Sequence, residues 1–304
     1  MDAELELPRP SKTVQCDPVL QRRYRSLVGS AMHPAVTCRP DGAAAVRELS
    51  AYLINPTQKH VDAAERVLQY LHHTIHLALE YRGGKDGVGA TQFYGTCDAS
   101  HNVTPDSKGI TGWVYHLAGG AIAWKSKAQM LVALSSCEAE LIAVDEAVRE
   151  LRFLHKLLVD LGQQVTTRAT LVGQDNQGTI ALCNSRHFNA RTRHVALRYH
   201  HVGDQQRLGV VRVSYLCTDE IPADALTKAL RSEPFLRHRK VLLGHVPIVW
   251  EELDNEPGHV VGTYQGGAYV VTTTQDAGEA SDAGIASSAG LALERRDPFD
   301  QCEA

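Results

Sequence analysis

FYGTCD (residues 93–98) and GWVYHLAGGAIAWK (residues 112–125) are the stretches that decide the fold. Both are short, contain β-branched and aromatic residues and lack proline, which is typical of strands. Gly119-Gly120 interrupts the second stretch and predicts a turn between strands at 112–117 and 121–125. The sequence therefore predicts three strands close together in this region.

The residues that follow alternate between helix and strand signals. A long helix is expected from about Ser136 to Leu161, then a strand at 169–174 and a helix at 176–183. Residues 210–216 alternate apolar and polar side chains, which predicts another strand. Strands followed by alternating helices and strands indicate an α/β fold, with helices packed on a mixed sheet.

The flanking regions differ in composition. Residues 42–53 suit a helix by propensity. Asn55-Pro56 predicts the start of a second helix, whose apolar stripe includes Val61 and Leu68. The division that follows is an extension (1–22), a small helical segment (23–85), the α/β domain (90–245) and an acidic, low-complexity tail (246–304) that we expect to be disordered.

Composition narrows the class of protein. The 304 residues carry a net charge of −4, but residues 251–304 hold eleven acids against two arginines, so the remaining body has a net charge of +5. A mildly basic body permits binding to a polyanion. Long apolar runs are absent, as is an apolar stretch near the N-terminus, so neither a membrane span nor a signal peptide is expected. The seven cysteines form no C-x-x-C pair, which favours a reducing intracellular compartment, cytoplasm or nucleus, over secretion.

Two aspartates end predicted strands. Asp98 follows FYGTC, and Asp175 follows ATLVGQ. Acids at the carboxyl ends of strands in an α/β sheet lie where ligands usually bind. Each aspartate, taken alone, is equally well explained as the start of a turn or the cap of a helix.

Glu140 is the most informative acid. The apolar stripe of the long helix contains Val144, and one turn back it reaches Glu140, so a carboxylate occupies the core-facing side. A buried carboxylate needs a partner, for which a metal ion is suitable. Glu138 forms a capping box with Ser135 and is expected on the solvated face, together with Asp145 and Arg149.

Asp224 lies in IPADALTK, at the expected start of a helix, where favourable interaction with the helix dipole is the simpler explanation. Four acids brought together would repel one another and raise their pKa values. Divalent cations with a preference for oxygen ligands, Mg²⁺ or Mn²⁺, would offset that repulsion. The residues alone allow a two-metal phosphodiesterase without requiring one.

A basic segment with aromatic residues lies between the last predicted helix and strand. Its candidates for contact with a nucleic-acid backbone are Arg186, Arg191, Arg193, His194 and Arg198. A solvated loop is the alternative. The histidines have no cysteine spacing that supports zinc, and Cys97 is expected to be a packed strand residue.

Several ordered motifs resemble the ribonuclease H region of copia-type LTR retrotransposon Pol polyproteins, preceded by the C-terminal end of the reverse transcriptase. The motifs are YRSLVGS (24–30), RPD (39–41), NPT (55–57), RVLQYL (66–71), IAWKSK (122–127), ALSSCEAE (133–140), DNQ (175–177), ARTRH (190–194) and ADALTK (223–228). They cover roughly residues 23–245. The set is specific, although no single motif is.

The resemblance implies a ribonuclease H-like fold and an endonuclease that hydrolyses the RNA strand of RNA–DNA hybrids. It implies that Asp98, Glu140, Asp175 and Asp224 chelate two Mg²⁺ ions, for which Mn²⁺ would substitute. Asp98 would bridge both ions, Glu140 and Asp175 would hold the leaving-group ion, and Asp224 would help hold the other. The implied partners are the hybrid and the rest of the polyprotein.

Two alternatives remain open. We find no Tyr-x-Asp-Asp polymerase motif, so DNA synthesis is not expected, and a catalytically silent nucleic-acid-binding remnant is one alternative. An integrase-like nuclease is the other, although it would require the order Asp, Asp, Glu, whereas the glutamate here comes second.

Overall fold

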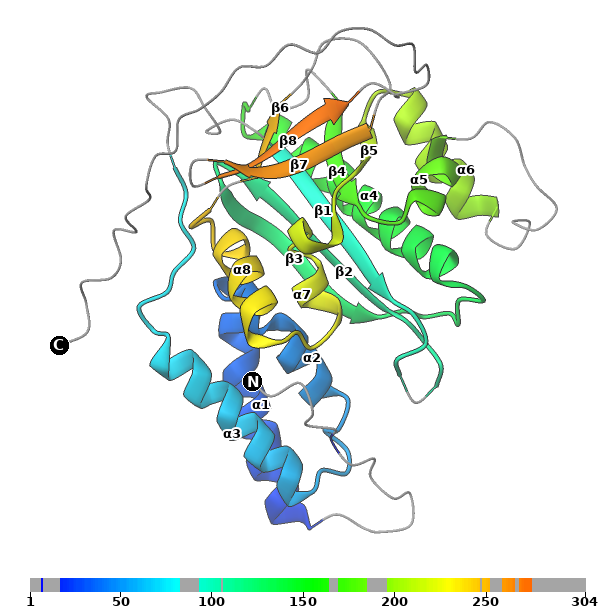
Figure 1. Ribbon diagram of the computed structural model, residues 1–304. Helices are drawn as coiled ribbons and strands as arrows, with labels where there is room; N and C mark the ends of the chain where they lie inside the picture. Colours follow the sequence, from blue (N-terminus) through cyan, green and yellow to red (C-terminus); the bar gives the residue numbers. More distant parts are fainter. Residues whose placement is uncertain are drawn as a thin grey trace, which may run out of the picture.

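The computed structural model describes residues 7, 17–82, 93–104, 106–163, 169–184, 196–246, 248–251, 259–265 and 268–274. A mixed sheet lies between two groups of helices, with a further helical segment below it in Figure 1. Its strands are β1 (Phe93–Ser100), β2 (Ile110–Leu117), β3 (Gly120–Ala128), β4 (Thr170–Gln174) and β5 (Val211–Tyr215).

The sheet has the order β3-β2-β1-β4-β5. β1 and β2, and β2 and β3, are antiparallel, whereas β4 runs parallel to both β1 and β5. The predicted mixed α/β sheet is therefore confirmed. The β2–β3 turn lies one residue earlier than predicted. Ala118 and Gly119, with φ of 54° and 80°, form the two-residue loop, since Leu117 already pairs with Gly120.

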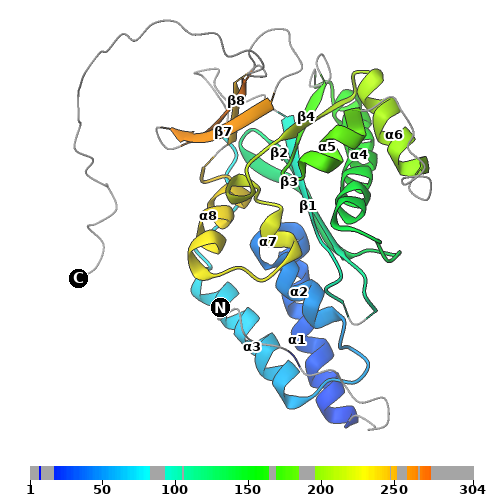
Figure 2. The ribbon, with the colours of Figure 1, turned by 45° about the vertical axis from the view of Figure 1, so that its right-hand side comes forward.

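One face of the sheet is covered by α4 (Ser136–Asp160), α5 (Gln177–Asn184) and α6 (Ala196–Arg207). The opposite face is covered by α7 (Asp224–Thr227) and α8 (Ser232–Leu242), as the rotated view in Figure 2 shows. The core therefore has two apolar layers, which lie on either side of the strands. Leu161, predicted to extend the α4 stripe, is exposed because the helix ends at Asp160.

The environment of Asp145 differs from the prediction because of α6. The sequence placed Asp145 on the solvated face of α4, but its side chain is buried and contacts Arg149, Arg198 and His201. The prediction was wrong because α6, a helix with little apolar periodicity, packs over this face of α4. Three cationic or titratable groups then satisfy the carboxylate, as a buried charge requires.

The N-terminal helices are α1 (Pro18–Thr37), α2 (Ala43–Ser50) and α3 (Gln58–His73). α1 begins inside the range predicted to be an extension, because Asp17 caps it and Pro18 occupies its first position. α3 begins later than predicted. Thr57, rather than Asn55, is its N-cap, and His60 completes a capping box.

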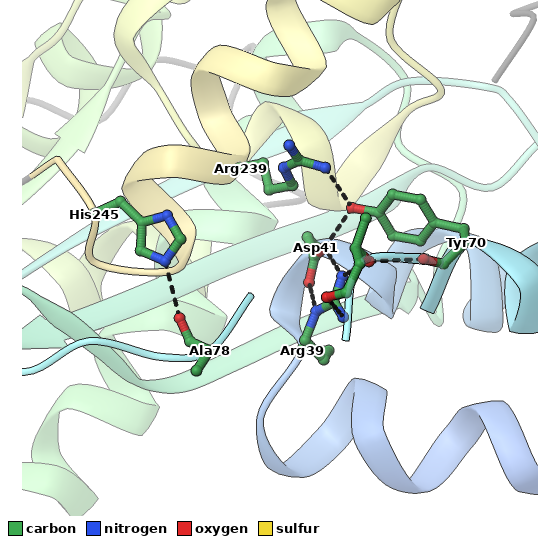
Figure 3. Close-up of polar contacts among 7 residues, drawn as sticks. Arg39, Asp41, Tyr70, Ala78, Arg239 and His245 are labelled. Carbon is green, nitrogen blue, oxygen red and sulfur yellow. Dashed lines mark hydrogen bonds and ion pairs between the residues drawn. The ribbon is translucent and has the colours of Figure 1, made fainter. Parts of the chain in front are cut away.

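The helical segment is bonded to the sheet domain at several points. Figure 3 shows a largely buried network in which Tyr70 donates to Asp41 at 2.5 Å and Arg239 of α8 reaches the Tyr70 hydroxyl at 3.3 Å. Arg39 completes the network with a bidentate ion pair to the carboxylate of Asp41. Trp124 of β3 donates to the carbonyl of Ala35 at 2.8 Å. These contacts join the segment predicted at 23–85 to the α/β domain.

Three backbone segments meet where a Cβ atom would not fit. A Cβ on Gly244 would lie 2.3 Å from the carbonyl oxygen of Glu80, and one on Gly120 would lie 2.4 Å from the same atom. The backbone N–H of Glu80 donates to the carbonyl of Leu243 at 2.8 Å. Glycine at both positions permits this close approach.

Part of the region predicted to be a disordered tail forms strands. They are β6 (Ile248–Glu251), β7 (His259–Gln265) and β8 (Ala268–Thr274), in the order β6-β8-β7. Here β-branched and aromatic residues such as Val260 and Tyr269 outweigh the low-complexity composition that had suggested disorder. Residues 275–304 lie outside the described residues. Among the described helices, none combines the length and apolarity needed to cross a bilayer.

Candidate active site

Strand register places Asp98 beside Asp175. β1 and β4 are parallel, with Thr96 opposite Gly173, and continuing this register by two residues aligns Asp98 with Asp175. Asp98 does not end its strand as predicted, because β1 continues to Ser100 through its pairing with β2. Asp98 lies beyond Thr96, the last residue of β1 that pairs with β4, and it is therefore next to the carboxyl end of β4.

Glu140 reaches the same place from α4. Ser135 caps that helix by accepting a hydrogen bond from the N–H of Glu138, which fixes the helical phase. Glu140 is 7% exposed, as its place in the apolar stripe predicts, whereas Glu138 is half-buried and accepts a hydrogen bond from the N–H of Leu134. The two carboxylates, two residues apart, therefore have different surroundings.

The first three acids form a compact group. One carboxylate oxygen from each of Asp98, Glu140 and Asp175 lies within 4.8 Å of the others. Asp98 and Glu140 are buried, and Asp175 is half-buried. Three oxygen ligands at this separation could hold a metal ion of the kind that prefers hard donors.

Asp224 approaches from α7, which packs directly on β2. A Cβ on Gly112 would lie 2.7 Å from Cγ2 of Thr227 and 2.9 Å from the carbonyl oxygen of Ala223, so glycine is needed for α7 to pack this closely on β2. Gly112 pairs with Asp98 across the strands, which brings α7 next to that aspartate. The Thr227 hydroxyl donates to Oδ2 of Asp98, and the ammonium of Lys228 contacts Oδ1 of Asp224.

Burial and mutual repulsion raise the pKa values of these acids. Burial, with the nearby charge of Asp224, raises the pKa of Asp98 to about 7. Burial, with the charges of Asp98 and Asp175, raises the pKa of Glu140 to about 9. Burial likewise raises the pKa of Asp224, against which Lys228 acts. The group is thus short of positive charge, which a divalent cation would supply.

The predicted nucleic-acid-binding residues are mostly not placed. Arg186, Arg191, Arg193 and His194 lie outside the described residues. Arg198 lies in α6, and its Nε is 3.6 Å from the buried carboxylate of Asp145. Its role in binding nucleic acid stays a prediction.

Three polar residues that the sequence did not single out hold the acids in place. Gln174 is buried, and its amide donates to Oε2 of Glu140 at 3.1 Å while its carbonyl oxygen accepts from the N–H of Asp175 at 2.7 Å. Thr218 donates to Oδ2 of Asp175 at 2.8 Å. Thr227 orients Asp98 as described. Each lies close to an acid in sequence or space, but only the packing of distant elements reveals the contacts of Thr218 and Thr227.

The sheet is mixed and five-stranded, in the order β3-β2-β1-β4-β5, with helices on both faces and acids near the carboxyl ends of its central strands. This arrangement defines a ribonuclease H-like fold. No family model matches the chain. Relatives do match. The retrovirus-related Pol polyprotein from transposon TNT 1-94 of Nicotiana tabacum is 37% identical over 215 residues, 70% of this chain and 16% of that protein. The corresponding protein from transposon RE2 of Arabidopsis thaliana is 35% identical over 225 residues, 74% of this chain and 15% of that protein.

The chain therefore belongs to the family of retrotransposon Pol polyproteins, and it spans about one sixth of the length of these two relatives. A shorter relative, the secreted RxLR effector protein 161 of Plasmopara viticola, is 40% identical over 128 residues, 42% of this chain and 87% of that protein. The resemblance seen in the motifs is confirmed by these matches.

Solved structures give weaker matches. A ribonuclease H1 (LC11-RNase H1) in complex with an RNA/DNA hybrid is 13% identical, with a TM-score of 0.35, and the match covers 45% of this chain and 94% of that one. The foamy viral protease-reverse transcriptase in complex with an RNA/DNA hybrid is 14% identical, with a TM-score of 0.38, over 84% of this chain and 28% of that one. TM-scores this low do not define a common fold, so the fold assignment rests on strand order and direction.

Proposed function

We propose that this chain is an endonuclease that hydrolyses the RNA strand of RNA–DNA hybrids, as one segment of a copia-type LTR retrotransposon Pol polyprotein. The observation that carries the proposal is the compact group of Asp98, Glu140 and Asp175, with ligand oxygens within 4.8 Å of one another. Asp224 lies beside Asp98, which completes the order Asp, Glu, Asp, Asp that the family resemblance implies. An integrase-like order would place the glutamate last.

The donor set fits two Mg²⁺ ions, with Mn²⁺ as a substitute. Every candidate ligand is a carboxylate, the donor that these ions prefer. Asp98 would hold both ions, Glu140 and Asp175 would hold one of them, and Asp224 would hold the other. Bound ions of this kind supply activation of a water molecule and stabilisation of the leaving oxygen of a phosphodiester.

The other residues of the chain hold the ligands in position. Gln174 connects Glu140 to the backbone at Asp175 and so fixes the distance between two ligands. Thr227 directs one oxygen of Asp98. In the reaction, water adds to phosphorus and the bond to the 3′ oxygen breaks, which leaves a 5′-phosphate and a 3′-hydroxyl.

Substrate choice must come from sugar and groove shape, because all duplexes offer phosphates. The wide minor groove of an A-like duplex presents ribose 2′-hydroxyls, which mark the strand to be cut. We propose that Glu140 takes part in this recognition, and that Arg186, Arg191, Arg193, His194 and Arg198 contact the backbone. A hybrid substrate fits an intracellular site of action, in the cytoplasm or nucleus.

The test is cleavage of labelled substrates by the purified chain with Mg²⁺, Mn²⁺ or EDTA. We expect metal-dependent cutting of the RNA strand in a hybrid, with no cutting of double-stranded RNA or DNA. A single deoxynucleotide in the RNA strand should protect the bond at that position. Equal cutting of double-stranded DNA would replace this proposal with the integrase-like function. Binding of the hybrid without cutting in either metal would favour the silent remnant.

A further inference from the structure

Lys228 has no part in the proposed function, yet it touches one of the four acids. Its ammonium contacts Oδ1 of Asp224, the first residue of α7, and Lys228 itself lies four residues further on, directly after that helix. The Asp224 side chain is 7% exposed, whereas that of Lys228 is 45% exposed. One end of this ion pair is therefore fixed in the core, and the other can reach solvent.

Asp224 stands apart from the compact group. The group within 4.8 Å contains Asp98, Glu140 and Asp175 but not Asp224. Its charge acts on Asp98, whose pKa it helps burial to raise. A buried carboxylate beside a second one is unfavourable unless a cation lies close by. In this structure that cation is the ammonium of Lys228.

The lysine is suited to a temporary contact. It follows directly after the last residue of α7, Thr227, so its backbone position is fixed by the packing of α7 on Gly112. Its long side chain has several rotatable bonds and a strongly hydrated head, which lets the ammonium withdraw to water without moving the helix. The nearby charges of Asp98 and Asp175 also favour its charged form.

We propose that Lys228 is an internal cation that holds Asp224 when no metal is present and competes with the divalent ion that Asp224 and Asp98 would share. This inference rests on the proposed two-metal function. It implies that the two ions bind with unequal affinity. The ion at Asp98, Glu140 and Asp175 binds regardless of Lys228, whereas the ion at Asp224 must displace the ammonium.

The experiment is calorimetric titration of the metal-free protein with Mn²⁺, without substrate. The proteins are the unaltered chain, Lys228→Met and Lys156→Met, an exposed lysine of α4 that serves as a control for the loss of one positive charge. We expect one tighter and one weaker site in the unaltered chain and the control. In Lys228→Met the weaker site should tighten about tenfold, the scale on which one close charge acts. The tighter site should change little.

A second measurement follows the metal-free state. In EDTA, Lys228→Met should unfold at a lower temperature than the control, and added Mn²⁺ should remove this difference. If Lys228→Met does not fold, Lys228→Gln keeps a donor toward Asp224 and carries the same expectation. An unchanged weaker site in a folded Lys228 variant would overturn the inference and leave the proposed function standing. Loss of the tighter site in Glu140→Gln would support that function separately. If no variant binds Mn²⁺, both are wrong.

Discussion

Glu138 and Glu140 lie two residues apart near the start of α4 and allow a matched test of the proposed site. We expect Glu140→Gln to reduce hybrid cleavage about a hundredfold or more, because it removes a charge from the metal ligands. Glu138→Gln should change the rate by no more than about twofold, since that carboxylate only caps the helix start. The measurement is the initial cleavage rate in Mg²⁺, with the fold checked by circular dichroism. Equal losses would show that the helical phase has been misassigned.

Local patterns were enough to predict the burial of Glu140 and the placement of Asp98 and Asp175 on neighbouring strands, but not the residues that contact these acids. The phase of α4 and the strand positions of Asp98 and Asp175 are properties of short stretches, so sequence periodicity reveals them. The burial of Asp145 depends on α6, which lies more than fifty residues further along and shows no clear apolar stripe. The contact of Thr227 with Asp98 depends on the packing of α7 on β2. Long-range packing of this kind leaves no mark in a single sequence.

At the scale of elements, the position of α7 depends on Gly112 of β2, which has no side chain. Gly112→Ala would put a methyl group 2.7 Å from Cγ2 of Thr227 and 2.9 Å from Cβ of Leu226. We expect this variant to lower the free energy of unfolding by about 1–3 kcal/mol and to abolish most cleavage. The added methyl group would push α7 away from the sheet, and Asp224 would move with that helix. Gly29→Ala, where a Cβ meets nothing within 4 Å, is the control.

The control variant has a defined expectation of its own. Gly29 lies inside α1, so alanine should raise the free energy of unfolding by about 0.5–1 kcal/mol and leave cleavage unchanged. Chemical denaturation of both variants measures the difference. A Gly112→Ala protein as stable and as active as the unaltered chain would mean that α7 is not held by this contact.

β2 and α8 are joined by a histidine that titrates outside its usual range. His116 is fully buried, stacks on Tyr94, and its Nε2 lies 3.2 Å from the carbonyl oxygen of Val241. Burial lowers its pKa to about 4. In the unfolded chain the same group titrates near 6.5, so below that pH the unfolded state binds a proton that the folded state does not.

Stability should therefore fall as the pH drops from about 6.5 to about 4, and His116 alone should contribute on the order of 3 kcal/mol to that loss. His238, whose pKa burial also lowers to about 4, adds to the effect. His116→Gln keeps a donor toward Val241 without a titrating ring. The measurement is the unfolding midpoint in urea at several pH values. A pH slope in His116→Gln as steep as in the unaltered chain would contradict the assignment.

At the scale of the whole molecule, the helical segment and the sheet domain share a hydrophobic cluster and a chain of hydrogen bonds. Ala43 and Leu79 pack on the cluster that contains Val114 and Leu226, and Arg47 bonds to Ser126, which in turn donates to the carbonyl of Leu226. We expect a chain that begins at residue 91 to lose cooperative unfolding, since it exposes this cluster and breaks these bonds.

The control for this truncation is a chain that spans residues 17–274. It keeps every described helix and strand, and Leu7 is the one described residue that it lacks. We expect that chain to unfold cooperatively in thermal circular dichroism. Cutting after residue 251, inside the region predicted to be a disordered tail (246–304), should instead destabilise the protein, because β6 would lose its partner β8. A stable, cooperative 91–304 fragment would show that the helices are dispensable.

The meeting of Glu80, Gly120 and Gly244 has a consequence for the order in which the protein is made. Arg82 and the carbonyl of His245, bonded at this junction, are 163 residues apart in the chain. The ribosome makes α3 and Leu79 well before α8, so Leu79 stays uncovered in the growing chain until α8 has been made. Closing so long a loop late slows folding and prolongs exposure to aggregation. We expect newly synthesised chains to depend on chaperones until α8 has emerged.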